Sequence, residues 1–188
     1  IYGQSEAPNF ITTLSKSDHL VSEYLSSCGQ PVIFCDVCIR NEQGESLDCK
    51  EVGEITVRSA YTMARYHDAP DKTDEAHFGA WLRTGDVGYQ SDTGHVYLVD
   101  RAKDMIISGG FNVYPKEVEQ VLDAHEDVRE SAVIGVAHPD FGEGVVAVIV
   151  STGTAPDTDA ILGLARQKLA AYKLPKRVFV VDELPRNT

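Results

Sequence analysis

Short runs of β-forming residues, separated by turn-forming residues, dominate the first hundred positions of the chain. Four such runs have the composition of strands, and they span residues 30–40, 53–59, 86–90 and 95–100. The last two flank Ser91-Asp-Thr-Gly94, a turn sequence whose glycine suits a tight hairpin. The polar stretch 60–81 predicts a helical or irregular segment that carries Tyr61, Tyr66 and Trp81 as packing aromatics. This part of the chain therefore predicts a β-rich unit.

The pattern changes beyond residue 100, where strand and helix patterns alternate. Met105-Ile-Ile107 predicts a short strand that leads into Gly109-Gly110. Pro115 suits the first position of a helix, and apolar residues then recur at helical spacing. The remaining predicted elements are strands at residues 128–136, 145–150 and 177–181 and a second helix at residues 157–172. We therefore expect an α+β protein, with a β-rich unit at residues 1–102 and a small mixed α+β unit at residues 103–188.

The charge balance narrows the choice of function. The chain has 17 basic and 29 acidic residues, which gives a net charge of -12. A nucleic-acid or anionic membrane partner would require a basic face, so we expect neither. Apolar runs fall short of the roughly 18 residues that a membrane-spanning helix needs. An anionic ligand would have to be held locally, by a few arginine, lysine or backbone N–H groups.

The spacing Cys35-x-x-Cys38 admits two interpretations. It fits part of a zinc or redox motif. It also lies in a predicted strand, where side chains three positions apart point to opposite faces, and this favours reduced thiols packed as small apolar groups. Reduced thiols are typical of cytosolic enzymes, so we expect a cytoplasmic protein.

Two short segments combine residue types that suit nucleotide chemistry. In Tyr2-Gly-Gln-Ser-Glu6, the glycine lets the backbone approach a ligand, the hydroxyl can donate to a phosphate oxygen, and the carboxylate is a hard ligand for Mg²⁺. In Trp81-Leu-Arg-Thr-Gly-Asp86, a carboxylate at the entry to a strand can accept hydrogen bonds from both ribose hydroxyls. The structural alternatives are a helix cap for the first segment and a turn aspartate for the second.

A longer segment, Asp100–Glu119, surrounds two adjacent glycines. Gly109 and Gly110 leave backbone exposed ahead of the predicted helix. Arg101 and Lys103 supply the positive charge that an anionic ligand would need. The glycine pair does not fit the G-x-G-x-x-G pattern of dinucleotide-binding folds, and a tight turn is the alternative interpretation.

Together, and in this order, the segments resemble the adenylate-forming enzymes and, within them, the AMP-forming acyl-CoA synthetases. Tyr2–Glu6 is similar to the family's Y-G-x-[ST]-E motif, and Trp81–Asp86 is similar to its [WF]-x-x-T-G-D motif. Asp100–Glu119 resembles the motif R-x-K-D-x-I-x-x-x-G-x-N-V-x-P-x-E-[IV]-E at nearly every fixed position. Leu184–Thr188 resembles the start of L-P-x-x-x-x-G-K. Residues 130–143 are particularly similar to malonyl-CoA synthetases.

This resemblance implies a ligase reaction in two steps. A carboxylic acid attacks the α-phosphate of ATP to give an acyl-adenylate and pyrophosphate, and coenzyme A then displaces AMP to give a thioester. The implied cofactors are ATP or AMP, Mg²⁺ and coenzyme A, and the implied substrate is a small carboxylic acid. A homodimer is compatible with this interpretation of the sequence. The alternatives are an adenylating ligase that uses a carrier protein in place of coenzyme A, and a non-catalytic interaction fragment.

The resemblance also implies catalytic roles for single residues. Ser5 would contact the α-phosphate, and Glu6 would hold Mg²⁺. Lys103 would be the hinge about which the small unit turns between the two half-reactions.

Five further residues would contact the nucleotide and the coenzyme. Tyr2 would line the adenine and acyl pocket, Asp86 would bind the ribose hydroxyls, and Arg101 would support Asp86. Gly109 and Gly110 would edge the pantetheine channel.

The resemblance finally implies the domain organisation. Residues 1–102 would be the end of the family's large domain, and residues 103–188 would be its small mobile domain. In the family, a glycine-rich phosphate loop precedes the first of these motifs and a lysine completes the last. We therefore expect a fragment that cannot form an acyl-adenylate alone.

Overall fold

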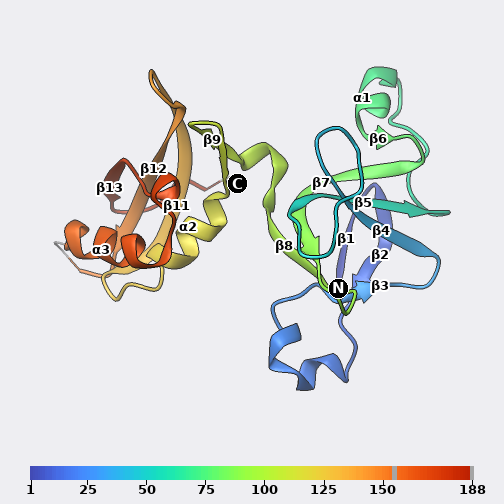
Figure 1. Ribbon diagram of the computed structural model, residues 1–188, viewed down its shortest axis with the longest axis horizontal. Coiled ribbons are helices and arrows are strands. Elements are labelled where there is room, and N and C mark those ends of the chain that lie inside the picture. Colours follow the sequence, from blue (N-terminus) through green and yellow to red (C-terminus); the bar gives the residue numbers. More distant parts are fainter. Residues whose placement is uncertain (154–155, 187–188) are drawn as a thin grey trace. The chain divides into compact units, whose positions relative to one another are not determined.

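The computed structural model describes residues 1–153 and 156–186. The chain divides into two compact units, Ile1–Ala102 (unit 1) and Lys103–Thr188 (unit 2). Figure 1 shows that strands dominate unit 1 and that helices accompany a sheet in unit 2. The predicted α+β fold class is confirmed.

Unit 1 is built from antiparallel strands. One sheet has the order β1-β2-β3, with β1 (Tyr2–Gln4), β2 (Ala7–Thr13) and β3 (Gln30–Pro31). Another has the order β4-β5-β7-β6, with β8 paired to β7; its strands are β4 (Cys35–Arg40), β5 (Gly53–Ser59), β6 (His77–Phe78), β7 (Trp81–Gln90) and β8 (Val96–Arg101). The helix α1 (Pro70–Glu75) lies in the polar stretch, and 3₁₀ turns at Asp18–Leu20 and Ser22–Tyr24 follow β2.

The core of unit 1 follows from the residue pattern of its strands. Ile55 and Val57 of β5 are fully buried at alternate positions. Thr56 between them is also buried, and its hydroxyl donates a hydrogen bond to a backbone carbonyl. Ile11 of β2 and Val96 of β8 belong to the same apolar cluster. Burial of side chains of this size contributes roughly 1.5–3 kcal/mol each, so this cluster holds the two sheets together.

The predicted hairpin around Ser91–Gly94 joins β7 to β8. The Gly94 N–H donates to the Ser91 carbonyl at 2.8 Å, and Gly94 has φ 82°, a value that glycine adopts without strain. The register of this hairpin places Asp86 directly opposite Arg101. The turn therefore brings two of the predicted site residues together.

The predicted strand 30–40 is interrupted. β3 ends at Pro31 and β4 begins at Cys35, and Phe34 between them has φ 63°, in the left-handed region. Cys35 is buried, whereas Cys38 is half-buried with its Sγ 3.2 Å from Ser46 Oγ. The cysteines at positions 28, 35, 38 and 49 are free thiols.

Unit 2 combines a mixed sheet with helices. Its strands are β9 (Ile106–Ser108), β10 (Phe111–Val113), β11 (Val128–His138), β12 (Gly142–Ser151) and β13 (Arg177–Val181). The order is β10-β9-β12-β11, and β13 pairs in parallel with β12. The helices are α2 (Pro115–Leu122) and α3 (Thr158–Lys168), with 3₁₀ turns at Ala102–Asp104 and Ala171–Lys173.

Helix α2 starts where the sequence predicts. Pro115 occupies the first turn, where its missing N–H costs no helical hydrogen bond. Val118 and Leu122 lie one turn apart and are fully buried, in a cluster that includes Val133 of β11 and Ile149 of β12. The apolar stripe of α2 thus attaches the helix to the sheet.

Two sequence predictions for unit 2 need correction. The second helix ends at Lys168 rather than at residue 172, because Leu169 is extended (φ -112°, ψ 148°) and packs in the core. The sequence pattern also does not predict β10, since Asn112 interrupts its three residues and leaves no apolar run like that of β9. Gly109 (φ 60°) and Gly110 (φ 81°) form the turn between β9 and β10, and two adjacent positive φ values favour glycine.

Candidate functional site

A buried carboxylate, Asp86 of β7, forms the centre of the candidate site in unit 1. The Tyr2 hydroxyl donates a hydrogen bond to Asp86 Oδ2 at 2.7 Å. Arg101 Nε lies 2.7 Å from Asp86 Oδ1. Three predicted site residues from β1, β7 and β8 therefore meet at one carboxylate, which we call the Asp86 centre (Tyr2, Asp86 and Arg101).

The backbone around Asp86 is fixed by its neighbours. The Asp86 N–H donates to Thr84 Oγ1 at 3.1 Å, and the Thr84 hydroxyl donates to the Ile55 carbonyl at 2.7 Å. The Gly85 N–H donates to Glu54 Oε1 at 3.2 Å, and Gly85 has φ 71°. Glycine suits this bend because a side chain would strain it. The carboxylate direction is thus set before any ligand arrives.

The two partners of Asp86 differ in exposure, because Tyr2 is buried and Arg101 is exposed. The Asp86 side chain is 7% exposed, whereas that of Arg101 is 56% exposed. Burial raises the pKa of the Tyr2 hydroxyl far above its ordinary value; the contact with Thr84 opposes this, and the hydrogen bond to Asp86 and the Asp86 charge add to it. Tyr2 consequently stays a proton donor to Asp86, and Arg101 can reach a ligand in solvent.

Glu6 lies at the turn between β1 and β2 with one carboxylate oxygen engaged. The Tyr66 hydroxyl donates to Glu6 Oε1 at 2.9 Å, and the Met63 N–H donates to the Glu6 carbonyl at 2.7 Å. The contact with Glu6 raises the pKa of Tyr66, with burial as a smaller cause. Ser5, beside Glu6 in the same turn, is exposed.

A single carboxylate, that of Glu6, is available as a metal ligand in this turn. One carboxylate suits Mg²⁺, whose other ligands can be phosphate and water, better than a metal that is bound by protein side chains alone. Within the residues that the structure describes, no group of three or more His, Cys, Asp or Glu side chains could hold a metal ion. Mg²⁺ commonly binds one or two carboxylates together with phosphates and water. The second oxygen of Glu6 could serve as such a ligand, and bound Mg²⁺ would neutralise phosphate charge.

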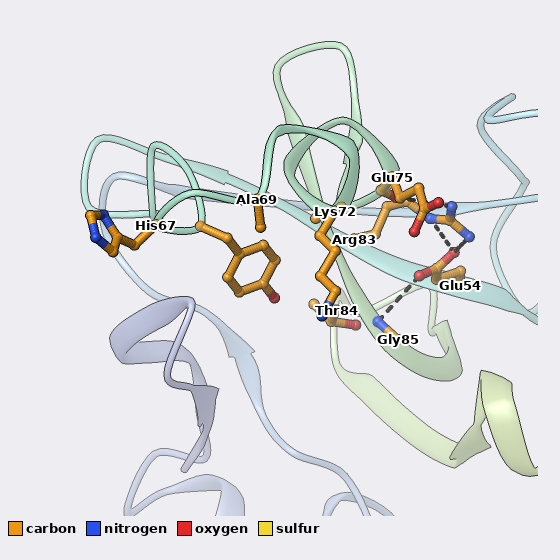
Figure 2. A pocket seen from close by; sticks show the side chains of 10 residues that line it. Glu54, His67, Ala69, Lys72, Glu75, Arg83, Thr84 and Gly85 are labelled. Carbon is orange, nitrogen blue, oxygen red and sulfur yellow. Dashed lines mark hydrogen bonds and ion pairs between the residues drawn. The ribbon is translucent and has the colours of Figure 1, made fainter.

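An open hollow of about 750 Å³ adjoins the bend that carries Gly85. Its lining residues are Glu54, Tyr66, His67, Ala69, Lys72, Glu75, Ala76, Arg83, Thr84 and Gly85. Figure 2 shows Glu54 bridging Arg83 and Gly85, with Lys72 extending from α1 toward Thr84. Arg83 Nε donates to Glu54 Oε2 at 2.9 Å, so Glu54 fixes both the strand and its bend.

In unit 2, aromatic and basic side chains surround the Gly109–Gly110 turn. Phe141 packs against Gly109, since a Cβ at Gly109 would lie 3.4 Å from its ring. Lys176 Nζ lies 5.0 Å from the centre of the Phe141 ring. Phe111, which follows the turn, is 56% exposed and stacks on Tyr172 with ring centres 4.7 Å apart. Exposed aromatic rings and a lysine thus lie close to this turn, an arrangement that can stack on a flat ring and pair with an anion.

The remaining predicted site residue, Lys103, is the first residue of unit 2 and is exposed. Sequence reasoning did not single out Thr84, Glu54 or Tyr66 as site residues. Thr84 directly precedes the Gly85-Asp86 pair and is a fixed position of the [WF]-x-x-T-G-D motif, so the sequence carries a local signal for it. Glu54 and Tyr66 carry no local signal, because their partners lie far away in sequence.

Comparison with known proteins identifies the class of protein. The family model described as AMP-binding enzyme matches residues 1–67, and the model described as AMP-binding enzyme C-terminal domain matches residues 117–188. The medium/long-chain-fatty-acid–CoA ligase FadD8 of Mycobacterium tuberculosis is 43% identical over 192 residues, which cover 98% of this chain and 34% of that protein. The chain thus spans about a third of the length of this relative.

Solved structures show the same similarity. The amide bond synthetase McbA from Marinactinospora thermotolerans matches with a TM-score of 0.87 and 42% identity, over 99% of this chain and 38% of that one. The o-succinylbenzoate CoA synthetase from Bacillus subtilis, in complex with its acyl-adenylate intermediate, matches with a TM-score of 0.88 and 36% identity over the same shares.

The fold and the matched segments define a part of an AMP-binding enzyme. The chain belongs to the AMP-binding enzyme family, with matches to both its AMP-binding and its C-terminal models. Among the described residues, we find no helix that is long and apolar enough to cross a membrane.

Proposed function

We propose that the chain is part of an ATP-dependent acid–thiol ligase that forms an acyl-CoA through an acyl-adenylate. The observation that carries the proposal is the Asp86 centre, a buried and pre-oriented carboxylate beside an exposed arginine. The family assignment and the acyl-adenylate bound to the Bacillus subtilis relative support it. Proposed partners are a carboxylic acid, ATP and coenzyme A, in the cytoplasm, with no nucleic acid.

In the adenylation step, the Asp86 centre would hold the ribose. An ionised carboxylate accepts hydrogen bonds from hydroxyl groups and is a stronger acceptor than a neutral group. Tyr2 and Arg101 each occupy one oxygen of Asp86 and leave its remaining lone pairs for the ribose hydroxyls. Because the carboxylate is already oriented, little conformational freedom would be lost when the nucleotide binds.

The turn between β1 and β2 would serve the phosphates. Ser5 is exposed and can donate its hydroxyl to an α-phosphate oxygen. Glu6, held by Tyr66, would present its free oxygen to Mg²⁺. Charge neutralisation at transferring phosphates is the main catalytic requirement of such a step.

The thioester-forming step would use unit 2. Lys103 would act as the hinge, because it is the first residue of that unit. Gly109 and Gly110 would line the path of the pantetheine arm, since they leave the backbone accessible at a turn. Phe141 with Lys176 would supply an aromatic face and a cation beside that path.

A chimera provides the test. Residues 1–188 replace the matching segment of the Bacillus subtilis o-succinylbenzoate CoA synthetase, which makes up 38% of that chain. We expect acid-dependent ATP–pyrophosphate exchange and thioester formation with coenzyme A. A folded chimera that binds AMP but catalyses neither reaction would contradict the proposal. Sedimentation of the chimera against the parent enzyme tests whether residues 1–188 support a homodimer.

A second candidate is an adenylating ligase that transfers the acyl group to an amine. The similarity to the amide bond synthetase McbA, over 99% of this chain, favours it. The same chimera distinguishes the acid–thiol ligase from the amide-forming ligase. Formation of an amide from an added amine, without thioester formation from coenzyme A, supports the amide-forming ligase. Transfer of the acyl group to a carrier protein would support the ligase that uses a carrier protein. Nucleotide binding without either reaction would support a non-catalytic fragment.

A further inference from the structure

The Gly109–Gly110 turn has few backbone contacts with the rest of its sheet. β9 pairs with β12 at the single register pair Ser108–Gly142. The Gly109 N–H donates to the Phe141 carbonyl at 2.9 Å. A hairpin of two three-residue strands is marginal by itself, so these contacts alone give the turn limited support.

A side chain supplies a further hydrogen bond to β9. Glu143 Oε2 of β12 accepts from the Ile107 N–H at 2.7 Å. The carboxylate thus replaces a sheet carbonyl and links the hairpin to the next strand. A hydrogen bond to an ionised acceptor is about twice as strong as one between neutral groups.

The neighbouring strand leaves space for this carboxylate. A Cβ at Gly135 of β11 would lie 2.8 Å from Glu143 Oε1 and 3.1 Å from Ile106 Cγ2. Gly135 is absent from the residues with positive φ among those described, so the space that Glu143 occupies, rather than backbone geometry, favours glycine there. Gly135, Glu143 and Ile107 therefore form one packed arrangement across β11, β12 and β9.

We infer that Glu143 is a positioning residue that fixes the Gly109–Gly110 turn for the thioester-forming step. This inference rests on the proposed function, because it assigns the turn to the path of the pantetheine arm. Without Glu143, the turn would keep its fold but sample several positions. A displacement of about 1 Å from the productive position can lower a rate by up to about a hundredfold.

The first experiment tests the contact in the 188-residue chain. Amide hydrogen exchange at Ile107 is measured by NMR for the wild type, Glu143→Ala, Glu143→Gln and Gly135→Ala. We expect exchange at least about tenfold faster in Glu143→Ala and Gly135→Ala, since opening then costs less free energy. Glu143→Gln keeps an acceptor oxygen but loses the charge, so its exchange rate should lie between those of Glu143→Ala and the wild type. Glu183→Ala, at an exposed carboxylate, is the matched control.

The second experiment uses the chimera and separates the half-reactions. Glu143→Ala should lower kcat for thioester formation at least about tenfold while ATP–pyrophosphate exchange stays within about twofold. Glu143→Gln, which keeps the acceptor oxygen without the charge, should restore part of the loss. A general folding defect would lower both reactions together and would not be rescued by glutamine.

The outcomes distinguish this inference from the proposed function. A wild-type chimera that forms adenylate but no thioester contradicts the proposed function, and with it the role of Glu143 in that step. An active wild-type chimera with unchanged thioester formation in Glu143→Ala overturns the inference alone. Unchanged exchange at Ile107 in Glu143→Ala also overturns it, whatever the activity.

Discussion

The hydrogen bond from the Tyr2 hydroxyl to Asp86 Oδ2 joins residues that are 84 positions apart, at 2.7 Å and in a buried setting. It gives Tyr2 a function that the motif alone does not suggest. The ring packs in the apolar core of unit 1 while the hydroxyl orients the carboxylate that would bind ribose. The aromatic residue of the first motif and the aspartate of the second thus act as one structural element.

Tyr2→Phe should destabilise unit 1 by about 1–3 kcal/mol, because it leaves a buried oxygen of Asp86 without its donor. The measurement is urea denaturation of the 188-residue chain, followed by Trp81 fluorescence, since this is the one tryptophan of the sequence and lies in unit 1. Tyr97→Phe is the matched control: its hydroxyl donates to the Glu23 carbonyl in an exposed setting. Equal losses in both variants would contradict a special role for Tyr2.

Asp86→Asn in the chimera should weaken AMP binding by about 1.5–3 kcal/mol, the usual scale for hydrogen bonds to a charged acceptor. Asparagine preserves the shape and its one oxygen can still accept from Tyr2, but its NH2 group then faces Arg101, so the change removes the charge and the Arg101 pair. Isothermal calorimetry with AMP measures the effect. Asp92→Asn, at an exposed aspartate that pairs with Lys50, should leave the affinity unchanged. Unchanged affinity in Asp86→Asn would reduce Asp86 to a turn residue.

The Tyr66–Glu6 contact predicts a titration. In the folded chain, the hydrogen bond to Glu6 favours the neutral hydroxyl of Tyr66. The pKa of Tyr66 therefore lies above its ordinary value of 10.0. The contact therefore stabilises the fold below pH 10 and is lost as the pH rises through the raised pKa. Glu6→Gln should lower the Tyr66 pKa, as observed by ¹³C NMR of the ring. Glu42→Gln, at an exposed site, should not change it; an unaltered Tyr66 curve in Glu6→Gln would argue against the contact.

Local features of the sequence predict most of the elements, whereas long-range pairs decide the site. Pro115 and the apolar spacing after it predict α2, because a helix start is encoded locally. Helix α3 ends before Leu169, because Leu169 is extended and packs in the core. The apolar spacing of the sequence continues past this point, so it does not predict the end of the helix.

The candidate site shows the same division. Motif spacing selects Asp86 and Glu6, but the donors that orient them, Tyr2 and Tyr66, come from positions 84 and 60 residues away. The sequence predicts Tyr66 as a packing aromatic, and its hydrogen bond to Glu6 adds a polar role. Such pairs depend on how the two sheets of unit 1 and the segment before α1 pack together, which a single sequence does not specify.

Lys103→Pro in the chimera tests the proposed hinge. If Lys103 is the hinge, its φ and ψ must change between the adenylating and thioester-forming arrangements. Proline fixes φ near about -65° and also restricts Ala102 before it, so one arrangement should be trapped. We expect the adenylating arrangement, because the first half-reaction needs no rotation once its substrates are bound. ATP–pyrophosphate exchange should then persist while thioester formation falls at least about tenfold, and the retained exchange excludes misfolding. Equal loss of both half-reactions in a folded chimera, or loss of neither, would place the hinge elsewhere.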